Sequence, residues 1–180
     1  MQGSGSGVYN INGKNAYDVD KSVDNGIFLG TNSNWRSQVL VYDFPLRLRL
    51  TLEVLSEQDE PLTVELKSDT KSIQFKYKKY DKNAFQFFNL PTNSEIGWSQ
   101  ACTLPVGVPF NVDIDLNDYT PRLYLNDVEL ICSPNNSFEF LGFDMNNLYL
   151  QVYSIQSNVK IHSINLVGTP YANINNKTGE

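Results

Sequence analysis

Cysteine, histidine and long apolar runs are scarce in this sequence of 180 residues, and each scarcity excludes a class of protein. Two cysteines are too few for a disulfide framework, and the spacing between Cys102 and Cys132 suits no zinc site. No apolar run approaches the roughly 18 residues that a membrane-spanning helix requires. We therefore expect two buried free thiols, no metal and no membrane insertion.

Catalytic signatures are equally sparse. His162 is the single histidine, and no Ser or Cys lies near it in a nucleophile motif, which is typical of a structural histidine. A glycosidase would need two carboxylates that face each other across a cleft. Asp113 and Asp115 instead fall on the same side of one expected strand, and we expect both to face solvent. The sequence therefore predicts a protein that is not an enzyme.

Positive charge is in deficit, with 14 Lys and Arg residues against 20 Asp and Glu residues, for a formal net charge of -6. This balance argues against a general polyanion binder, because neutralising phosphates requires clustered lysines and arginines. Lysines and aromatics do interleave between residues 75 and 88, as in some nucleic-acid-binding strands. Alternation, however, places Phe75 and Tyr77 opposite Lys76 and Lys78, toward the core. We therefore expect no nucleic acid as a partner.

In the first 36 residues, Val8–Ile11 and Ile27–Leu29 could form short edge strands, but no longer strand pattern is present, and residues 1–36 are interpreted as an N-terminal extension. Residues 1–7 form a flexible Gly/Ser tract where a secretory signal would need a charged and then an apolar segment. Dense Asn, Asp and Gly follow, and Trp35 is expected to pack this extension. The domain proper is assigned to residues 37–169 and a polar tail to residues 170–180. The missing leader leaves the cytoplasm and leaderless export both open as locations.

Two-residue alternation of apolar and polar side chains dominates the rest of the chain. It is clearest in residues 46–54, where leucines alternate with Arg47, Arg49 and Glu53. No stretch shows a sustained 3.6-residue helical period, and turn signals recur about every ten residues. This pattern predicts an all-β sandwich or barrel. The expected strands span residues 39–42, 46–54, 62–66, 73–78, 85–89, 99–104, 110–116, 123–125, 128–132, 148–153 and 159–167, the last of which is expected to pair with 148–153.

Residues 104–132 provide the strongest local indication of antiparallel pairing. Three short strands, 110–116, 123–125 and 128–132, are separated by a polar turn and by the tight turn Asn126-Asp127. Strands this close in sequence are expected to pair in antiparallel order and to form one end of a sandwich.

The order of the strands and a set of residues along them resemble the galectin family over residues 46–167, most of the chain. The residues that carry the resemblance are the strand pair 62–66 and 73–80, Asn89, Gly97-Trp98, Gly107-Val108-Pro109-Phe110, Leu125-Asn126-Asp127 and Asn158-Val159-Lys160-Ile161. The resemblance implies a galectin-like jelly-roll sandwich of two antiparallel sheets. It also implies a lectin whose concave face holds β-galactosides, with no metal, cofactor or catalysis.

The resemblance also implies candidate sugar-binding residues. Trp98 resembles the tryptophan on which galactose stacks, and Asn89 resembles the family's asparagine at the end of the preceding strand. Where the family has Glu and Arg, three and five residues past the tryptophan, this chain has Ala101 and Thr103. These side chains cannot supply the charge-assisted hydrogen bonds that Glu and Arg make to sugar hydroxyls. An altered or lost glycan specificity is therefore expected.

Where galectins have His, Asn and Arg on an earlier strand, this chain offers Lys76, Lys78 and Tyr80. Lys76 and Lys78 share one side of their strand, and Tyr80 continues the row if the strand continues. Further lysines lie nearby in sequence, at Lys67, Lys71, Lys79 and Lys82. A lysine ammonium suits an anionic group better than a neutral diol, which leads to the hypothesis of a sialylated or sulfated galactose-containing glycan. The alternative is that these charges only block an exposed strand edge.

Two functions from different classes are open at this stage. The first is a non-enzymatic carbohydrate-binding module whose partners are glycans or glycoproteins. The second is a galectin-like sandwich used for protein–protein contact, or as an attachment head that binds no sugar, since such sandwiches also form viral spike heads, as in rotaviruses. The glycan and the oligomeric state stay open from sequence alone.

Overall fold

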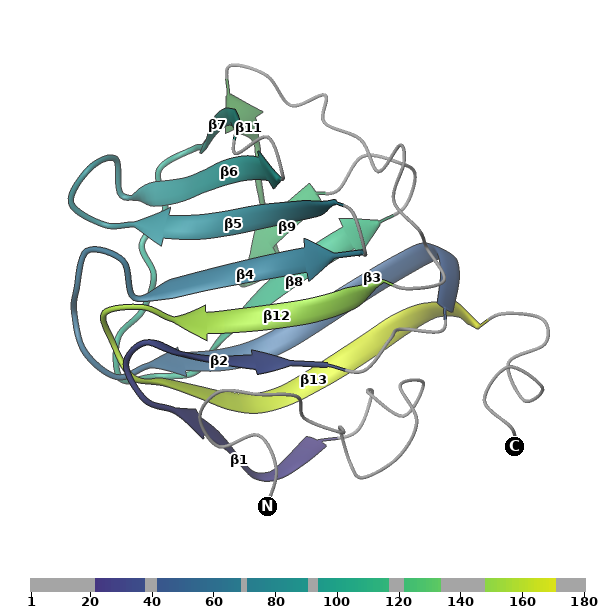
Figure 1. Cartoon of the computed structure of the whole chain (residues 1–180), viewed down its shortest axis with the longest axis horizontal. Coiled ribbons are helices and arrows are strands. Elements are labelled where there is room, and N and C mark those ends of the chain that lie inside the picture. Colours follow the sequence, from purple (N-terminus) through teal and green to yellow (C-terminus); the bar gives the residue numbers. More distant parts are fainter. Residues whose placement is uncertain are drawn as a thin grey trace.

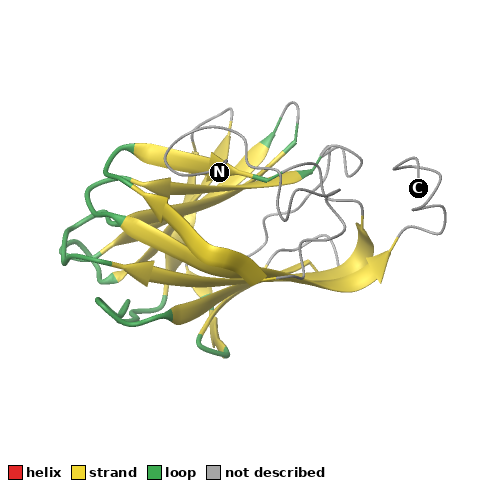
Figure 2. Ribbon diagram, turned by 90° about the horizontal axis from the view of Figure 1, so that it is seen from below, coloured by secondary structure: helices red, strands yellow, loops and turns green. Residues whose placement is uncertain are grey.

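The computed structural model describes residues 22–37, 42–68, 71–90, 94–116, 122–133 and 148–170. All thirteen elements in these ranges are β-strands, and they form two layers (Figures 1 and 2). A six-stranded sheet has the order β1-β13-β3-β8-β9-β10, and a seven-stranded sheet has the order β11-β7-β6-β5-β4-β12-β2. Neighbouring strands in both sheets run antiparallel. The predicted all-β sandwich of two antiparallel sheets is therefore confirmed.

The six-stranded sheet is built around a long central strand with a leucine face. Its strands are β1 (Ser22–Leu29), β3 (Tyr42–Val54), β8 (Phe110–Leu116), β9 (Arg122–Leu125), β10 (Val128–Leu130) and β13 (Val159–Pro170). Leu50 on β3 lies opposite Val112 on β8 and Ile164 on β13, and all three side chains are buried. Because opposite residues share a face of the sheet, the arginines that alternate with the leucines point outward.

The seven-stranded sheet carries the candidate site on the face that is turned away from the core. Its strands are β2 (Ser33–Arg36), β4 (Leu62–Lys67), β5 (Ser72–Lys78), β6 (Ala84–Leu90), β7 (Ser94–Ser99), β11 (Cys132–Ser133) and β12 (Tyr149–Ser154). Along β5, Ile73, Phe75 and Tyr77 are buried in the core. Lys76 and Lys78 alternate with them and are half-buried on the opposite face. We call this opposite face the outer face of the seven-stranded sheet.

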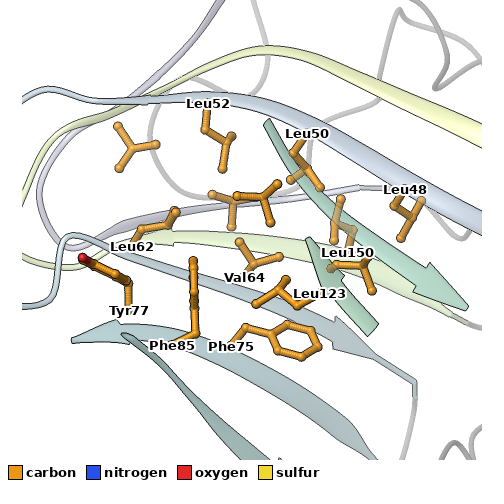
Figure 3. Close-up of a cluster of buried hydrophobic side chains, with 14 of the residues drawn as sticks. Leu48, Leu50, Leu52, Leu62, Val64, Phe75, Tyr77, Phe85, Leu123 and Leu150 are labelled. Atoms are coloured by element: carbon orange, nitrogen blue, oxygen red, sulfur yellow. The ribbon is translucent and has the colours of Figure 1, made fainter. Parts of the chain in front are cut away.

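The core lies between the two layers and joins aliphatic to aromatic side chains. Figure 3 shows leucines of β3 facing side chains of β4, β5 and β12 across this layer. On the aromatic side, the rings of Phe75 and Phe87 meet edge to face with centroids 5.0 Å apart. Truncating such a buried ring to alanine costs about 3–5 kcal/mol, so this packing holds β5 and β6 firmly in place under the outer face.

The N-terminal boundary of the domain differs from the prediction. Residues 22–36, assigned to an extension, contribute one strand to each sheet, because β1 pairs with β13 and β2 pairs with β12. Trp35 on β2 is fully buried in the sandwich core. Positive φ angles at Gly26 (69°) and Asn32 (61°), with a register shift in β1, interrupt the alternation, so that the sequence indicates only Ile27–Leu29 of β1. At the other end, β13 reaches Pro170, one residue into the assigned tail.

Two other strand assignments are wrong, and the single strand expected at residues 128–132 is divided between β10 and β11, which belong to different sheets. The short strand expected at residues 99–104 is absent from the described structure, and β7 instead precedes it and contains Trp98. The last strand, β13, pairs with β3 and β1 in the other sheet, not with 148–153. Alternation indicates which face of a strand is buried, but not which strand lies beside it. The pairing of β13 was therefore predicted wrongly.

The described loops gather mostly at one end of the sandwich (Figure 2). The possible edge strand at Val8–Ile11 and the remainder of the assigned tail, residues 171–180, lie outside the described residues. Within the described ranges, no helix is long and apolar enough to cross a membrane.

Candidate functional site

Strand register aligns a row of side chains across the outer face of the seven-stranded sheet. From β2 to β7 the row consists of Asn34, Tyr153, Thr63, Lys76, Gln86 and Trp98. Residues directly opposite each other on antiparallel strands have Cβ atoms about 4.5–5.5 Å apart, so each member can contact the next. An aromatic ring, an amide and an ammonium group therefore stand next to one another at the β5–β7 end of this face.

Trp98 lies on β7 directly opposite Gln86 of β6. Only 9% of its surface is exposed, although it is not a member of the core cluster between the sheets. The ammonium of Lys82, from the turn between β5 and β6, lies over the indole ring at 4.9 Å from its centroid. The lysine is itself exposed. The tryptophan is therefore covered on one ring face by a surface cation.

The outward-facing residues of β5 begin and end two residues earlier than predicted. The strand ends at Lys78, and Tyr80 lies beyond it in the following turn with 66% of its surface exposed. Tyr80 therefore does not continue the row of Lys76 and Lys78. Gln74 occupies the third outward position instead, opposite Phe88. Sequence alternation alone could have found Gln74, because it lies two residues before Lys76.

Asn89 is not aligned with Trp98. Its backbone position on β6 is paired with Ile73, whose side chain is buried in the core. The side chain of Asn89 is outside the described part of the structure. The neighbouring Phe88 faces outward, and the ammonium of Lys76 lies 5.3 Å from the centroid of its ring. A second lysine thus covers a second aromatic ring on this face.

Acidic residues of the loop between β3 and β4, residues 55–61, bind the lysines at the end of β5. Lys78 Nζ lies 2.5 Å from Glu60 Oε2 and 3.3 Å from Asp59 Oδ2, and Lys76 Nζ lies 3.9 Å from Glu60 Oε1. Lys79 pairs with Glu57 of the same loop at 3.0 Å. The hydrogen bond from Lys78 to Glu60 raises the pKa of Lys78 above its usual value. These lysines are therefore largely neutralised from within the chain.

A buried polar network occupies the centre of the outer face. The hydroxyl of Tyr153 lies 2.6 Å from Glu65 Oε1 and 2.6 Å from Gln151 Oε1, and Gln74 Nε2 donates to Glu65 Oε2 at 3.4 Å. The hydroxyl has one proton, and the carboxylate of Glu65 is its stronger acceptor. Burial raises the pKa of Tyr153, and the hydrogen bond to Glu65 raises it further.

Glu65 is unusual for a carboxylate on an outward face, because only 2% of its surface is exposed. No Lys or Arg nitrogen of the described ranges lies within ion-pair distance of it. The sequence missed this network, since Glu65 looks like an ordinary solvent-facing residue of an alternating strand. Only the register of β4 with β5 and β12 brings its partners together.

Asp113 does not face solvent as predicted. Its side chain is 1% exposed, and Arg47 Nε at 2.8 Å and Arg49 Nε at 2.9 Å both bind its carboxylate. Register explains this burial, because Arg49 lies directly opposite Asp113 on the outer face of the six-stranded sheet. The carboxylate is therefore committed to a structural ion pair.

His162 and Cys102, the remaining candidates for chemistry, have structural surroundings. His162 Nε2 lies 2.8 Å from Glu53 Oε1 on the six-stranded sheet. Cys102 is a half-buried free thiol, and burial raises its pKa to about 11. The side chain of Cys132 is outside the described part. In the described ranges, no three His, Cys, Asp or Glu residues are grouped closely enough to hold a metal ion.

Comparison with known proteins identifies the fold. No protein-family model matches this sequence, and neither does any curated protein. A galectin of Caenorhabditis elegans is similar in structure, with a TM-score of 0.58 and 13% identity over 73% of this chain and 89% of that one. A Bacillus subtilis protein of unknown function with a galectin-like fold has a TM-score of 0.59 and 5% identity over 82% of this chain and 84% of that one.

A carbohydrate-binding module of Bacillus subtilis is similar as well, with a TM-score of 0.50 and 10% identity over 76% of this chain and 82% of that one. At such low identities the similarity concerns the fold alone. The chain is therefore a galectin-like jelly-roll sandwich, as its strand order predicts.

Proposed function

We propose that this protein is a non-enzymatic carbohydrate-binding module that holds a glycan on the outer face of the seven-stranded sheet. The observation that carries the proposal is the alignment of Trp98 with Gln86 and Lys76 across three adjacent strands. This combination of a flat apolar surface, an amide and a cation matches the two kinds of surface that a sugar presents. The C–H face of a sugar packs on an aromatic ring, and the hydroxyls of the sugar need hydrogen-bond donors and acceptors.

The proposed ligand is a galactose-containing glycan with a sialyl or sulfate group, free or on a glycoprotein. Its acidic group would meet the lysines at this end of the sheet, whereas neutral galectin ligands meet the charged Glu and Arg that this chain has replaced with Ala101 and Thr103. A lysine is a point charge with three donors, and this geometry favours an anionic group over a planar diol. Similarity in fold to galectins and to a carbohydrate-binding module supports the same class of ligand.

A second candidate function is protein–protein contact, or attachment, without any sugar. It is favoured by the low exposure of Trp98, 9%, and by the ion pairs that Lys78 makes with Asp59 and Glu60. A face whose ring is covered and whose charges are paired can be a closed surface that only another protein contacts. The two functions differ in whether a glycan reaches Trp98.

A glycan array with and without added salt, run on the wild type and on Trp98→Ala, tests the proposal. We expect the wild type to bind acidic galactosides more weakly as salt rises, because salt screens ion pairs. Trp98→Ala should weaken binding by about fivefold or more, if a sugar stacked on the ring contributes as much as a stacked base, about 1–3 kcal/mol. Tyr124→Ala, a ring on the outer face of the other sheet, is the matched control and should bind normally.

Two results would contradict the proposal. One is a wild type that binds no glycan on the array although circular dichroism shows it folded. The other is a Trp98→Ala protein that binds glycans as tightly as the wild type. In either case protein–protein contact becomes the better explanation of this face.

A further inference from the structure

The lysines around the candidate site differ in how their charge is satisfied. Lys78 and Lys79 each have a carboxylate oxygen within 3.0 Å, and Lys76 has one at 3.9 Å. All of these carboxylates belong to the loop between β3 and β4. An incoming acidic ligand must therefore compete with carboxylates that are already bound to Lys78 and Lys79.

Lys82 is placed differently. No carboxylate of the described ranges lies within ion-pair distance of its ammonium, and the described contact of that group is with the ring of Trp98, at 4.9 Å from the centroid. Its side chain is exposed and belongs to the turn between β5 and β6, so it can move without disturbing a strand. Cation–π contacts at exposed sites are weak, and the ammonium can leave the ring at low cost.

We propose that Lys82 is a specificity-determining residue of the glycan site: its ammonium group, which covers Trp98 in the free protein, leaves the ring when a sugar packs on this tryptophan and then pairs with a sulfate ester or a sialic acid carboxylate of that sugar. The inference rests on the proposed function. It moves the recognition of the acidic group from Lys78, which is bound by Asp59 and Glu60, to the lysine that lies directly over the stacking ring.

The site discriminates between neutral and acidic galactosides because the two ligands affect the ammonium of Lys82 differently. A neutral galactoside must displace Lys82 from the indole and offers the ammonium only a neutral oxygen in return. An acidic galactoside displaces it equally, but gives it an anionic partner and a charge-assisted hydrogen bond. Because specificity is a difference between two affinities, the same lysine disfavours the neutral sugar and favours the acidic one.

The test is calorimetric titration of lactose, 3′-sulfolactose and 3′-sialyllactose into the full chain and its variants. We expect Lys82→Met to weaken binding of both acidic sugars about tenfold, the loss of one charge-assisted hydrogen bond, and to leave lactose binding equal or tighter. Lys82→Arg keeps the charge and should keep the preference for acidic sugars. Lys160→Met, which removes one lysine from the six-stranded sheet, controls for the change in net charge and should have no effect.

The possible failures are distinguishable. If the wild type prefers acidic sugars, Trp98→Ala abolishes binding, and Lys82→Met still prefers them as the wild type does, the inference about Lys82 is overturned and the proposed function stands. If Lys78→Met removes the preference and Lys82→Met does not, acid recognition belongs to Lys78 and the inference is likewise overturned. If the folded wild type binds none of the three sugars, both fall.

Discussion

The outer faces of the two sheets both carry charge, but they use it in different ways. On the six-stranded sheet, Arg49 of β3 binds Asp113 directly opposite it on β8, and Arg47 binds the same carboxylate diagonally. Arg49 also pairs with Asp127 of the turn between β9 and β10. On the seven-stranded sheet, the lysines of β5 are paired with acidic residues of the loop between β3 and β4.

Aromatic residues sharpen the contrast. The ring on the six-stranded face, Tyr124, is covered by Arg47 at 4.2 Å, and that arginine is also bound to Asp113. Trp98 on the seven-stranded face is covered by Lys82, which has no such second partner among the described residues. A face whose cations are tied within the sheet contributes to stability. A face whose ring is covered by an exposed lysine with no carboxylate partner among the described residues can be opened by a ligand.

The largest expected effect concerns the ion pairs on the outer face of the six-stranded sheet. Asp113→Asn should lower the free energy of unfolding by about 2 kcal/mol, because it leaves two arginines facing each other without their buried carboxylate. The value is below the range for fully buried pairs, since both arginines are more than one-third exposed, at 35% and 37%.

Urea denaturation measures this loss, and Asp115→Asn on the same strand is the matched control. Asp115 is less buried than Asp113, and its replacement should cost less than about 1 kcal/mol. Glycan binding should be unchanged in both variants. Equal losses in the two variants would show that the Arg47–Asp113–Arg49 cluster is no more than ordinary surface charge.

The buried network of the seven-stranded sheet should give the next largest effect. Tyr153→Phe removes the hydroxyl that donates to Glu65 at 2.6 Å and leaves this buried carboxylate, among the described residues, with only the long contact to Gln74. We expect a loss of about 1–2 kcal/mol in unfolding free energy. Adding Glu65→Gln to this variant should recover part of the loss, because a neutral amide costs less to bury than an unpaired charge. If the double variant is less stable than Tyr153→Phe alone, the hydrogen bond between Tyr153 and Glu65 is contradicted.

The same tyrosine predicts a dependence on alkaline pH. An unfolded tyrosine titrates near pH 10, and burial raises the pKa of folded Tyr153 above that value. Its contribution to stability is therefore fully present below about pH 10 and is lost as the pH rises through the folded pKa. Above pH 10 the wild type should lose stability more steeply than Tyr153→Phe, in urea denaturation repeated along a pH series. Tyr77, whose pKa is also raised by burial, is present in both proteins, so its contribution cancels in the difference between the two stability curves. Parallel curves for the two proteins would show that Tyr153 does not titrate differently on folding.

The sequence predicted the class of fold because the alternation of residues 46–54 is long and uninterrupted, and one buried face per strand implies two layers. It missed β2 and identified only Ile27–Leu29 of β1 as a possible edge strand, because positive φ angles at Gly26 and Asn32 break the short apolar stretches there. It paired β13 wrongly, because no local pattern encodes which strand lies beside which.

The candidate site was predictable to the extent that it depends on strand period. Lys76 and Lys78 share a face because they are two residues apart, and this holds for any straight strand. The end of β5 before Tyr80 and the return of the β3–β4 loop onto Lys78 depend on contacts distant in sequence. The contact of Lys82 with Trp98 likewise joins a turn to a strand that lies beyond β6. Such contacts require the assembled sheet.

The smallest expected effect compares the two kinds of ion pair directly. In a double-mutant cycle of Lys78→Met with Glu60→Gln, the coupling energy should be below about 1 kcal/mol, because one partner is on a loop and both are partly exposed. The equivalent cycle of Arg49→Met with Asp113→Asn should give a larger coupling, since Arg49 binds a buried carboxylate through Nε and Nη2. Urea denaturation of the single and double variants measures both couplings. If the loop pair is coupled as strongly as the cross-strand pair, the acidic loop stabilises the fold as Asp113 does. The outer face of the seven-stranded sheet would then be as closed as its counterpart, and a glycan would have little there to displace.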